Sequence, residues 1–339
     1  MLKGALIGCG FFAYNHLYAW KQLVGAEIVA LCDMDDERLN AAGEKFGIDR
    51  RYRDARSMFE SEQLDFVDIA TTVNSHRLLV EMAAAAKAAC ICQKPFARSA
   101  SDAEAMVAAC AKAGVPLMVH ENFRWQTPIQ AIRRALDDSA IGKPFWGRFS
   151  FRSAFDVYRA QPYLAEGKRF IIEDLGIHIL DVARFIMGDV TTISATIQRI
   201  NPKIVGEDVA TMLLAHQNGS TSVVDCSYAS ARADEVFPQT LVEIDGDGGS
   251  LRLDAGYKLT TYNRQTGTKI VDCTPPLHEW AEKPWFNIQD SVVNIQNHWL
   301  ECLQDGQEPQ TSGRDNLKTL ALVEAAYASA SNGETVKLA

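Results

Sequence analysis

The chain lacks a long hydrophobic segment. Its 339 residues contain no apolar run of the roughly 20 residues that cross a bilayer. The opening residues MLKGALIGCG pass directly into a strand-like pattern. They lack the basic start, apolar stretch and cleavage site of a secretion signal. We therefore expect no membrane partner and a cytoplasmic location.

Basic residues are fewer than acidic residues in this chain. The chain has 34 Lys and Arg against 43 Asp and Glu, which gives a formal net charge of -9. Nucleic acids and anionic membranes are bound by basic faces. We expect no nucleic-acid partner.

Paired cysteines are also missing. The eight cysteines are scattered and none forms a C-x-x-C pair, so we interpret them as reduced thiols that pack as small hydrophobes. The seven histidines do not cluster with them at metal-ligand spacing. The sequence predicts no disulfide framework and no metal site.

The first third of the chain alternates strand-like and helical patterns. Strand-like segments are KGALIG, EIVALCD, FVDIA, AACIC and VPLMVHE. Helical patterns cover 12–23, 36–46, 77–87 and 101–113, the last with a capping box of Ser101 and Glu104. This alternation is typical of βαβ units. We expect a Rossmann doubly wound parallel sheet over residues 1–122, which makes the fold class α/β.

The pattern changes after about residue 123. A helix is expected over 127–136, followed by strand-like segments in series such as TTISATIQRI, ATMLLAHQ and STSVVDCSYAS. Two more helices are expected over 173–186 and 316–331. Residues 123–339 therefore read as an α+β domain with a large, open, mostly antiparallel sheet.

A glycine-rich turn follows the first strand. Gly8-Cys9-Gly10-Phe11-Phe12-Ala13 matches G-x-G-x-x-A between a strand and a helix. There the chain must turn sharply, approach a pyrophosphate closely and present free helix N–H groups to it. Gly8, Gly10, Phe11 and Phe12 are therefore candidate cofactor-binding residues. The alternative is an ordinary glycine-rich turn.

The second strand ends in an acidic residue. Asp33 lies about 20 to 25 residues beyond the glycines, where a carboxylate accepts hydrogen bonds from the adenosine ribose and repels a 2′-phosphate. No Arg follows immediately, so NAD is favoured over NADP. Asp33 is otherwise a solvated strand-end residue. Arg38 is placed over the adenine or, equally well, in solvent.

Two further strand ends carry polar side chains. Thr71, Asn74 and His76 follow FVDIA, and Gln93 and Lys94 follow AACIC. Ligands bind at the carboxyl ends of strands in such sheets. Thr71, Asn74 and His76 fit the ribose and nicotinamide side, although the segment alone is equally an ordinary helix start. Pro95 biases Lys94 to an extended conformation, although a lone Lys is usually solvated.

Asp174 and His178 are spaced i and i+4 on an expected helix, so they share a face. Alcohol oxidation needs a base for the hydroxyl proton, and His titrates near neutral pH. An ammonium such as that of Lys94 can hold the reacting oxygen. An Asp–His link without chemistry is the other interpretation.

The order of these motifs resembles the Gfo/Idh/MocA oxidoreductase family along the whole chain. The lysine–proline pair and the segment D-x-G-x-H from Asp174 are the specific parts. The resemblance implies that Lys94, Asp174 and His178 converge across the domain interface. It also implies that the C-terminal sheet serves substrate binding and assembly into a homodimer or homotetramer.

Two departures from the family pattern stand out. Gln93 replaces the motif glutamate, which removes a negative charge beside Lys94. The usual glycine-rich stretch before Asp174 is replaced by residues 169–173, so the substrate pocket is expected to differ from those of inositol or glucose enzymes.

The resemblance implies that Arg124, Trp125 and Arg152 lie in segments that reach the substrate. Each has a structural alternative as a core or salt-bridged residue. The segments ENFRWQ and RFIIEDLGIHILD are similar to a branch that oxidises a branched aldopentose at its anomeric carbon to a lactone.

These observations predict an NAD-dependent dehydrogenase of a small polyhydroxy substrate, a sugar or polyol. Lys94 binds the reacting oxygen, and His178 is the general base or relays the proton. Asp174 orients the pair and offsets the lysine charge. Two alternatives stay open: an NAD-dependent glycosidase of the same family, and a non-catalytic NAD or sugar sensor.

Overall fold

The computed structural model describes residues 1–159 and 161–338. The chain divides into two compact units. The first unit contains Met1–Glu121 and Val292–Leu320, and the second contains Asn122–Ser291 and Ala321–Ala339. The boundary after residue 121 lies one residue from the sequence-based division, whereas residues 292–320 pack with the first unit instead of the second.

The first unit is built on a parallel sheet with the strand order β3-β2-β1-β4-β5-β6. Its strands are β1 (Leu2–Ile7), β2 (Ala26–Cys32), β3 (Arg50–Tyr52), β4 (Phe66–Ile69), β5 (Ala89–Gln93) and β6 (Leu117–His120). Its connecting helices are α1 (Ala13–Gln22), α2 (Asp36–Phe46), α3 (Ala55–Ser61), α4 (Val73–Ala85) and α5 (Ala100–Ala113). This strand order is that of a Rossmann fold and reverses between β1 and β4.

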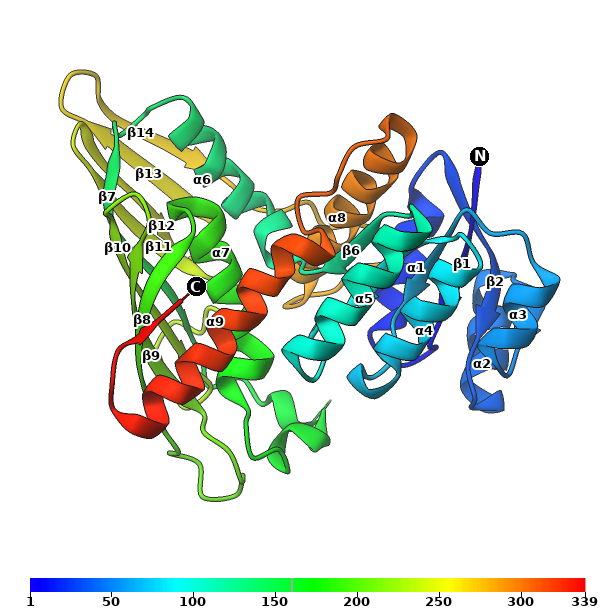
Figure 1. The fold of residues 1–339 in the computed structure, drawn as a ribbon. Coiled ribbons are helices and arrows are strands. Elements are labelled where there is room, and N and C mark those ends of the chain that lie inside the picture. The colour runs from blue at the N-terminus through cyan, green and yellow to red at the C-terminus, as the bar shows by residue number, and fades with distance from the viewer. Residues whose placement is uncertain (160, 339) are drawn as a thin grey trace. The chain divides into compact units, whose positions relative to one another are not determined.

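The strands form because they are apolar runs that are buried on both faces, as parallel sheets require. Helix ends follow local polar residues: the Asp35 carboxylate caps α2, and Gly47 ends it in the left-handed conformation. The expected capping box of Ser101 and Glu104 is wrong. The helix begins at Ala100, one residue before the expected start, so Ser99 is the N-cap and its hydroxyl accepts from the Asp102 N–H at 3.1 Å. Helices α4 and α5 lie side by side (Figure 1).

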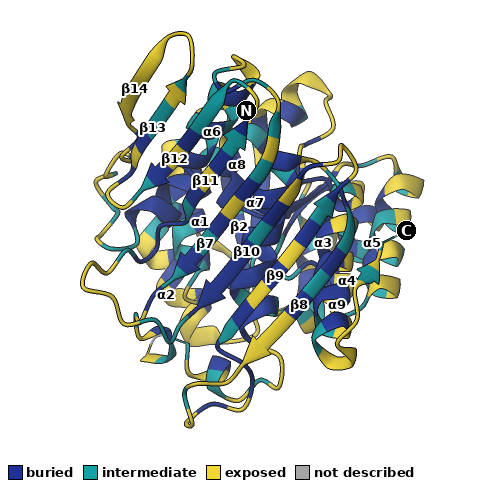
Figure 2. Ribbon diagram, turned by 90° about the vertical axis from the view of Figure 1, so that its left-hand side faces the viewer, coloured by how far each residue is buried: buried dark blue, intermediate teal, exposed yellow. Residues whose placement is uncertain are grey.

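The second unit is built on a sheet with the order β14-β13-β12-β11-β7-β10-β9-β8-β15 within the described residues. The strands are β7 (Pro144–Arg152), β8 (Val190–Gln198), β9 (Val209–His216), β10 (Thr221–Ser227), β11 (Leu241–Gly246), β12 (Gly249–Asp254), β13 (Lys258–Asn263), β14 (Gly267–Asp272) and β15 (Val336–Lys337). Neighbours pair antiparallel except β7 with β10. Along β9, buried residues alternate with partly or fully exposed ones (Figure 2), as in a sheet with one covered face.

The helical elements of the second unit include η1 (Phe123–Trp125), α6 (Thr127–Asp137) and α7 (Ile177–Met187). A π-helical turn, Ile172–Gly176, precedes α7, so the continuous α-helix expected from residue 173 is wrong. Helices α8 (Phe286–Asp305) and α9 (Gly313–Asn332) contribute residues to both units. Across the described ranges, no helix has both the length and the apolar character to span a membrane.

Candidate active site

The glycine-rich turn between β1 and α1 has the geometry that a pyrophosphate requires. Gly8 has a φ of +97°, and a Cβ there would lie 2.8 Å from the carbonyl oxygen of Ala70, so the position requires glycine. A Cβ on Gly10 would meet no described atom within 4 Å, which leaves the backbone open to a ligand. Phe12 is the N-cap of α1 and gives no side-chain cap. The first N–H groups of α1 can therefore meet an anion.

Asp33 lies directly over this turn. Its Oδ2 accepts from the Cys9 N–H at 2.5 Å and its Oδ1 accepts from the Asp35 N–H at 2.8 Å. Each carboxylate oxygen keeps a further lone pair for a ribose hydroxyl. Burial, together with the Asp33 charge, raises the pKa of the Cys9 thiol to about 12. The thiol beside the cofactor turn therefore stays protonated and inert.

The neighbouring predicted residues are more exposed. The Phe11 ring is 62% exposed. Arg38 is also solvated and pairs with Asp35 at 3.3 Å. Both lie at the same edge of the parallel sheet as Asp33, where the sequence predicts the cofactor.

His76 is buried, unlike its neighbours Thr71 and Asn74. Its Nδ1 lies 3.1 Å from the Pro95 carbonyl oxygen, and its Nε2 lies 3.1 Å from the Thr71 carbonyl oxygen. Burial lowers the pKa of His76. The His76 ring therefore holds the segment after β4 and the segment after β5 in place relative to each other.

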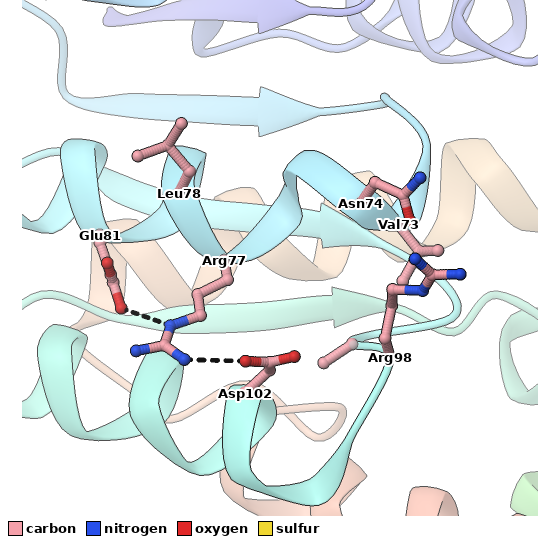
Figure 3. Close-up of a pocket in the computed structure, with 8 residues that line it drawn as sticks. Val73, Asn74, Arg77, Leu78, Glu81, Arg98 and Asp102 are labelled. Atoms are coloured by element: carbon pink, nitrogen blue, oxygen red, sulfur yellow. Dashed lines mark hydrogen bonds and ion pairs between the residues drawn. The ribbon is translucent and has the colours of Figure 1, made fainter.

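Asn74 lines a pocket of about 270 Å³ beside α4 and α5 (Figure 3). Arg77 spans one side of it, with its guanidinium 2.9 Å from Glu81 and 2.8 Å from Asp102. The pair with Glu81 lies within α4, and the pair with Asp102 joins α4 to α5.

Gln93 is the last residue of β5, and Lys94 follows it. The Lys94 N–H donates to the Gln93 Oε1 at 2.7 Å, and the Gln93 amide nitrogen lies 3.2 Å from the Nε2 of His16. The Lys94 segment is thus held by Gln93 on one side and, through Pro95, by His76 on the other.

The sequence did not predict the buried group that contacts Gln93 from behind. Asp68 lies within buried β4 and accepts from His16 Nδ1 at 2.8 Å, from Trp20 Nε1 at 2.7 Å and from Gln296 Nε2 at 3.3 Å. A carboxylate inside the apolar segment FVDIA was the available signal, because such a charge is buried only with partners.

In the second unit, His178 lies on α7 with 5% of its surface exposed, and its ring stacks on Phe123 at 4.0 Å. Asp174 lies in the preceding π-helical turn, where its N–H donates to the Phe170 carbonyl at 2.8 Å. Turns of this kind occur frequently at functional sites.

Arg124 is buried in η1 and makes a bidentate pair with Asp181 of α7, at 2.7 and 2.5 Å. This pair fixes η1, including the buried Trp125, against the helix that carries His178. Arg152 ends β7, with a third of its side chain exposed, and lies 3.7 Å from Asp225.

The segment 169–173, which replaces the family's glycine-rich stretch, is anchored by Glu207. One carboxylate oxygen accepts from the Phe170 N–H at 3.1 Å and from the Tyr327 hydroxyl at 2.6 Å. The Tyr327 oxygen accepts from the Glu173 N–H at 3.2 Å. Arg169 lies over the Tyr327 ring at 4.0 Å. The residues just before Asp174 are therefore held from both sides.

Lys94 belongs to the first unit, whereas Asp174 and His178 belong to the second. Their convergence stays a prediction. All eight cysteines, which lie in the described ranges, are free and buried. Within the same ranges, no group of three or more His, Cys, Asp or Glu could hold a metal ion.

The strand order, the glycine turn and Asp33 together define a dinucleotide-binding protein with a Rossmann fold. Comparison with family models agrees: residues 2–121 match the oxidoreductase family with an NAD-binding Rossmann fold, and residues 129–252 match the GFO/IDH/MocA C-terminal domain. The chain belongs to the Gfo/Idh/MocA family and is an NAD-dependent oxidoreductase.

Several relatives match over nearly the whole chain. A D-apiose dehydrogenase of Paraburkholderia graminis is 68% identical over 99% of this chain and 89% of its own length. One from Rhizobium rhizogenes is 63% identical over 99% of this chain and 97% of its own. The crystal structure of an oxidoreductase from Agrobacterium radiobacter with NAD+, L-tartaric acid and magnesium is 63% identical, with a TM-score of 0.98 over 99% of this chain and 98% of that one.

Proposed function

We propose that this protein oxidises D-apiose at its anomeric carbon, with NAD, to give a lactone. The observation that carries the proposal is the identity of 68% and 63% to two D-apiose dehydrogenases along 99% of the chain. The open turn at Gly10 and the carboxylate of Asp33 fit NAD, because they leave room for a pyrophosphate and acceptors for ribose hydroxyls.

The proposed chemistry uses three side chains of the chain itself. Lys94 holds the hydroxyl oxygen on the anomeric carbon, His178 takes the hydroxyl proton and Asp174 orients the pair and offsets the lysine charge. The C–H bond of that carbon breaks as hydride leaves, and a carbonyl forms. When bound, NAD supplies the nicotinamide that accepts the hydride.

Residues of the second unit would recognise the sugar. The partly exposed guanidinium of Arg152 can donate to sugar hydroxyls. Trp125 would pack near the sugar, with Arg124 acting through its pair with Asp181. In this proposal, the first unit binds the cofactor, and the second unit binds the substrate and forms a homodimer or homotetramer. The protein is in the cytoplasm.

The deciding test is a panel of pentoses, hexoses, polyols and inositols, including D-apiose, with NAD and with NADP. Net NADH, read at about 340 nm, should appear best with D-apiose and NAD. A redox-neutral glycosidase would release sugar without net NADH, and a sensor would bind NAD without turnover. Either result would overturn the proposal.

Lys94→Ala provides the first prediction. It should lower turnover by at least about a hundredfold, because the reacting oxygen loses its cation, while NAD binding by calorimetry persists. Lys112→Ala, which removes an exposed lysine of α5, is the matched control and should match the parent. Near-normal turnover of Lys94→Ala would refute its role.

A further inference from the structure

A buried chain of hydrogen bonds runs from Asp68 to the backbone of Lys94. Asp68 and His16 are fully buried, with the His16 Nδ1 2.8 Å from the carboxylate. The other ring nitrogen of His16 lies 3.2 Å from the amide nitrogen of Gln93. The amide oxygen of Gln93 accepts from the Lys94 N–H at 2.7 Å. Asp68 on β4, His16 on α1, Gln93 on β5 and the backbone of Lys94 just after β5 are thereby linked in series.

The direction of each hydrogen bond in this chain is fixed by its partners. The backbone N–H of Lys94 can only donate, so the atom of Gln93 that faces it is the oxygen. The amide NH₂ of Gln93 must then face His16 and donate to it. The Nε2 of His16 therefore accepts and carries no proton, and its Nδ1–H donates to Asp68. The arrangement requires a neutral imidazole of one tautomer.

We propose that Gln93 is a positioning residue for Lys94, and that it acts through this neutral His16 tautomer. The proposal deepens the proposed function and rests on it. Asp68 selects the protonated nitrogen of His16, His16 orients the amide of Gln93, and Gln93 fixes the first peptide of the Lys94 segment. His76 fixes the same segment at the Pro95 carbonyl. The backbone from which the Lys94 side chain extends is thus held at both ends.

The same geometry explains what a glutamate at position 93 would require. One carboxylate oxygen would accept from the Lys94 N–H, and the other would need a proton on His16 Nε2, because a carboxylate has none to donate. His16 would then be an imidazolium between two carboxylates. Its charge would offset that of the added glutamate, so the net charge of the group would equal that of the parent. Gln93 achieves the same positioning without that proton.

Titratable groups from each neighbouring strand lie near His16. They are Asp68 on β4 and His120 on β6, whose ring stacks on His16 at 4.1 Å; Cys92 on β5 lies near Asp68. The buried Glu121 follows His120. Burial and the charge of Asp68 keep the pKa of the Cys92 thiol well above its usual value. The aromatic side chains of Phe12 and Trp20 and the amide of Gln296 complete the surroundings.

The test compares Gln93→Glu with the parent enzyme at each pH, using D-apiose and NAD. Taking the ratio of the two kcat values removes the pH dependence that both enzymes have in common. We expect a ratio within about threefold of unity near pH 6 that falls toward higher pH, because a carboxylate at position 93 can bond to the His16 ring only through a shared proton. In the double variant Gln93→Glu with His16→Asn, the ratio should be low at every pH and should not change with pH.

Gln63→Glu is the matched control, since it adds the same charge at an exposed position of the first unit. The ratio of the kcat of Gln63→Glu to that of the parent should stay near unity at every pH. A ratio for Gln93→Glu that does not change with pH would overturn the proposal, and so would the same pH dependence in Gln63→Glu. Thermal unfolding and NAD titration of each variant verify that it is folded.

A second measurement does not depend on the substrate. Nitrogen-15 NMR of the histidine rings, assigned with His16→Asn, should show His16 in the parent with a protonated Nδ1 and a bare Nε2 between about pH 6 and pH 8. A protonated Nε2 would overturn the proposal even in a fully active enzyme. If D-apiose is not oxidised, the proposed function is wrong. The role of Gln93 is then tested by measuring the same kcat ratio with the substrate of the panel that is oxidised fastest.

Discussion

Asp33 holds the glycine turn, and we predict that it also selects the cofactor. Its two oxygens accept backbone N–H groups of Cys9 and Asp35, which sets the carboxylate at the end of β2. A negative charge in that place accepts ribose hydroxyls and repels a 2′-phosphate. Asp33 therefore holds the turn in shape, and we predict that its charge also favours NAD over NADP.

Asp33→Asn keeps the size of the side chain and one of its two backbone acceptors, and it removes the charge. We expect the Kd for NAD to rise about 10- to 100-fold, since hydrogen bonds to a charged group are worth about 1.5–3 kcal/mol. The ratio of the Kd for NADP to the Kd for NAD should decrease. Titration calorimetry with both cofactors measures this, and Asp36→Asn, at an exposed neighbour, is the control. An unchanged Kd would contradict the role of Asp33.

At the residue scale, the sequence predicts side chains at strand ends better than their partners. Asp33 and Lys94 were placed because parallel strands end at one edge of the sheet. The partners of Asp68 were not found: His16 is 52 residues away along the chain, and Gln296 is 228 residues away. Local patterns carry no information about pairings over such separations.

At the element scale, segment 169–173 shows how a loop without its usual glycines is held. Its backbone N–H groups at Phe170 and Ile172 donate to the buried carboxylate of Glu207, and the N–H of Glu173 donates to Tyr327. The charge of Glu207 raises the pKa of Tyr327, after the larger effect of burial. Tyr327 therefore stays protonated and can donate to Glu207 at any physiological pH.

Tyr327→Phe removes that hydroxyl and leaves the Glu207 carboxylate short of a donor. We expect a loss of about 1–3 kcal/mol in the free energy of unfolding, from urea titration, and a rise in KM for the sugar with little change in the Kd for NAD. The exposed Tyr262 provides the control as Tyr262→Phe. A variant with parental stability and KM would show that the anchor is dispensable.

The bounds of a helix were predicted well where its capping residues and its apolar periodicity indicate the same ends. Helix α2 has the bounds that were expected, 36–46, because Asp35 and Gly47 delimit it. The π-helical turn at Ile172–Gly176 was missed, since its apolar spacing resembles that of an α-helix and the wider turn depends on tertiary contacts.

At the scale of the whole molecule, the sequence correctly predicts where the parallel sheet ends and the antiparallel sheet begins. It does not predict that a later segment of the chain packs with the first unit. Residues 292–320 pack in the first unit, and Leu320 belongs to its hydrophobic core. An amphipathic helix shows that it has a buried face without showing which sheet covers that face. Assigning α8 and the start of α9 to a unit therefore requires the three-dimensional fold.

The second sheet presents a face on which we base the final prediction. On β9, Met212 and Leu214 are fully buried, whereas Leu213 between them is 53% exposed and pairs with Val223 of β10. If homodimers or homotetramers form through this face, Leu213→Asp should place an unpaired charge in the interface and reduce the mass in light scattering to the protomer's 37.4 kDa. Val24→Asp, at a position 91% exposed in the first unit, should keep the parental mass. An oligomer that survives Leu213→Asp would place the interface elsewhere, because a buried aspartate without a partner costs more than one exposed leucine contributes.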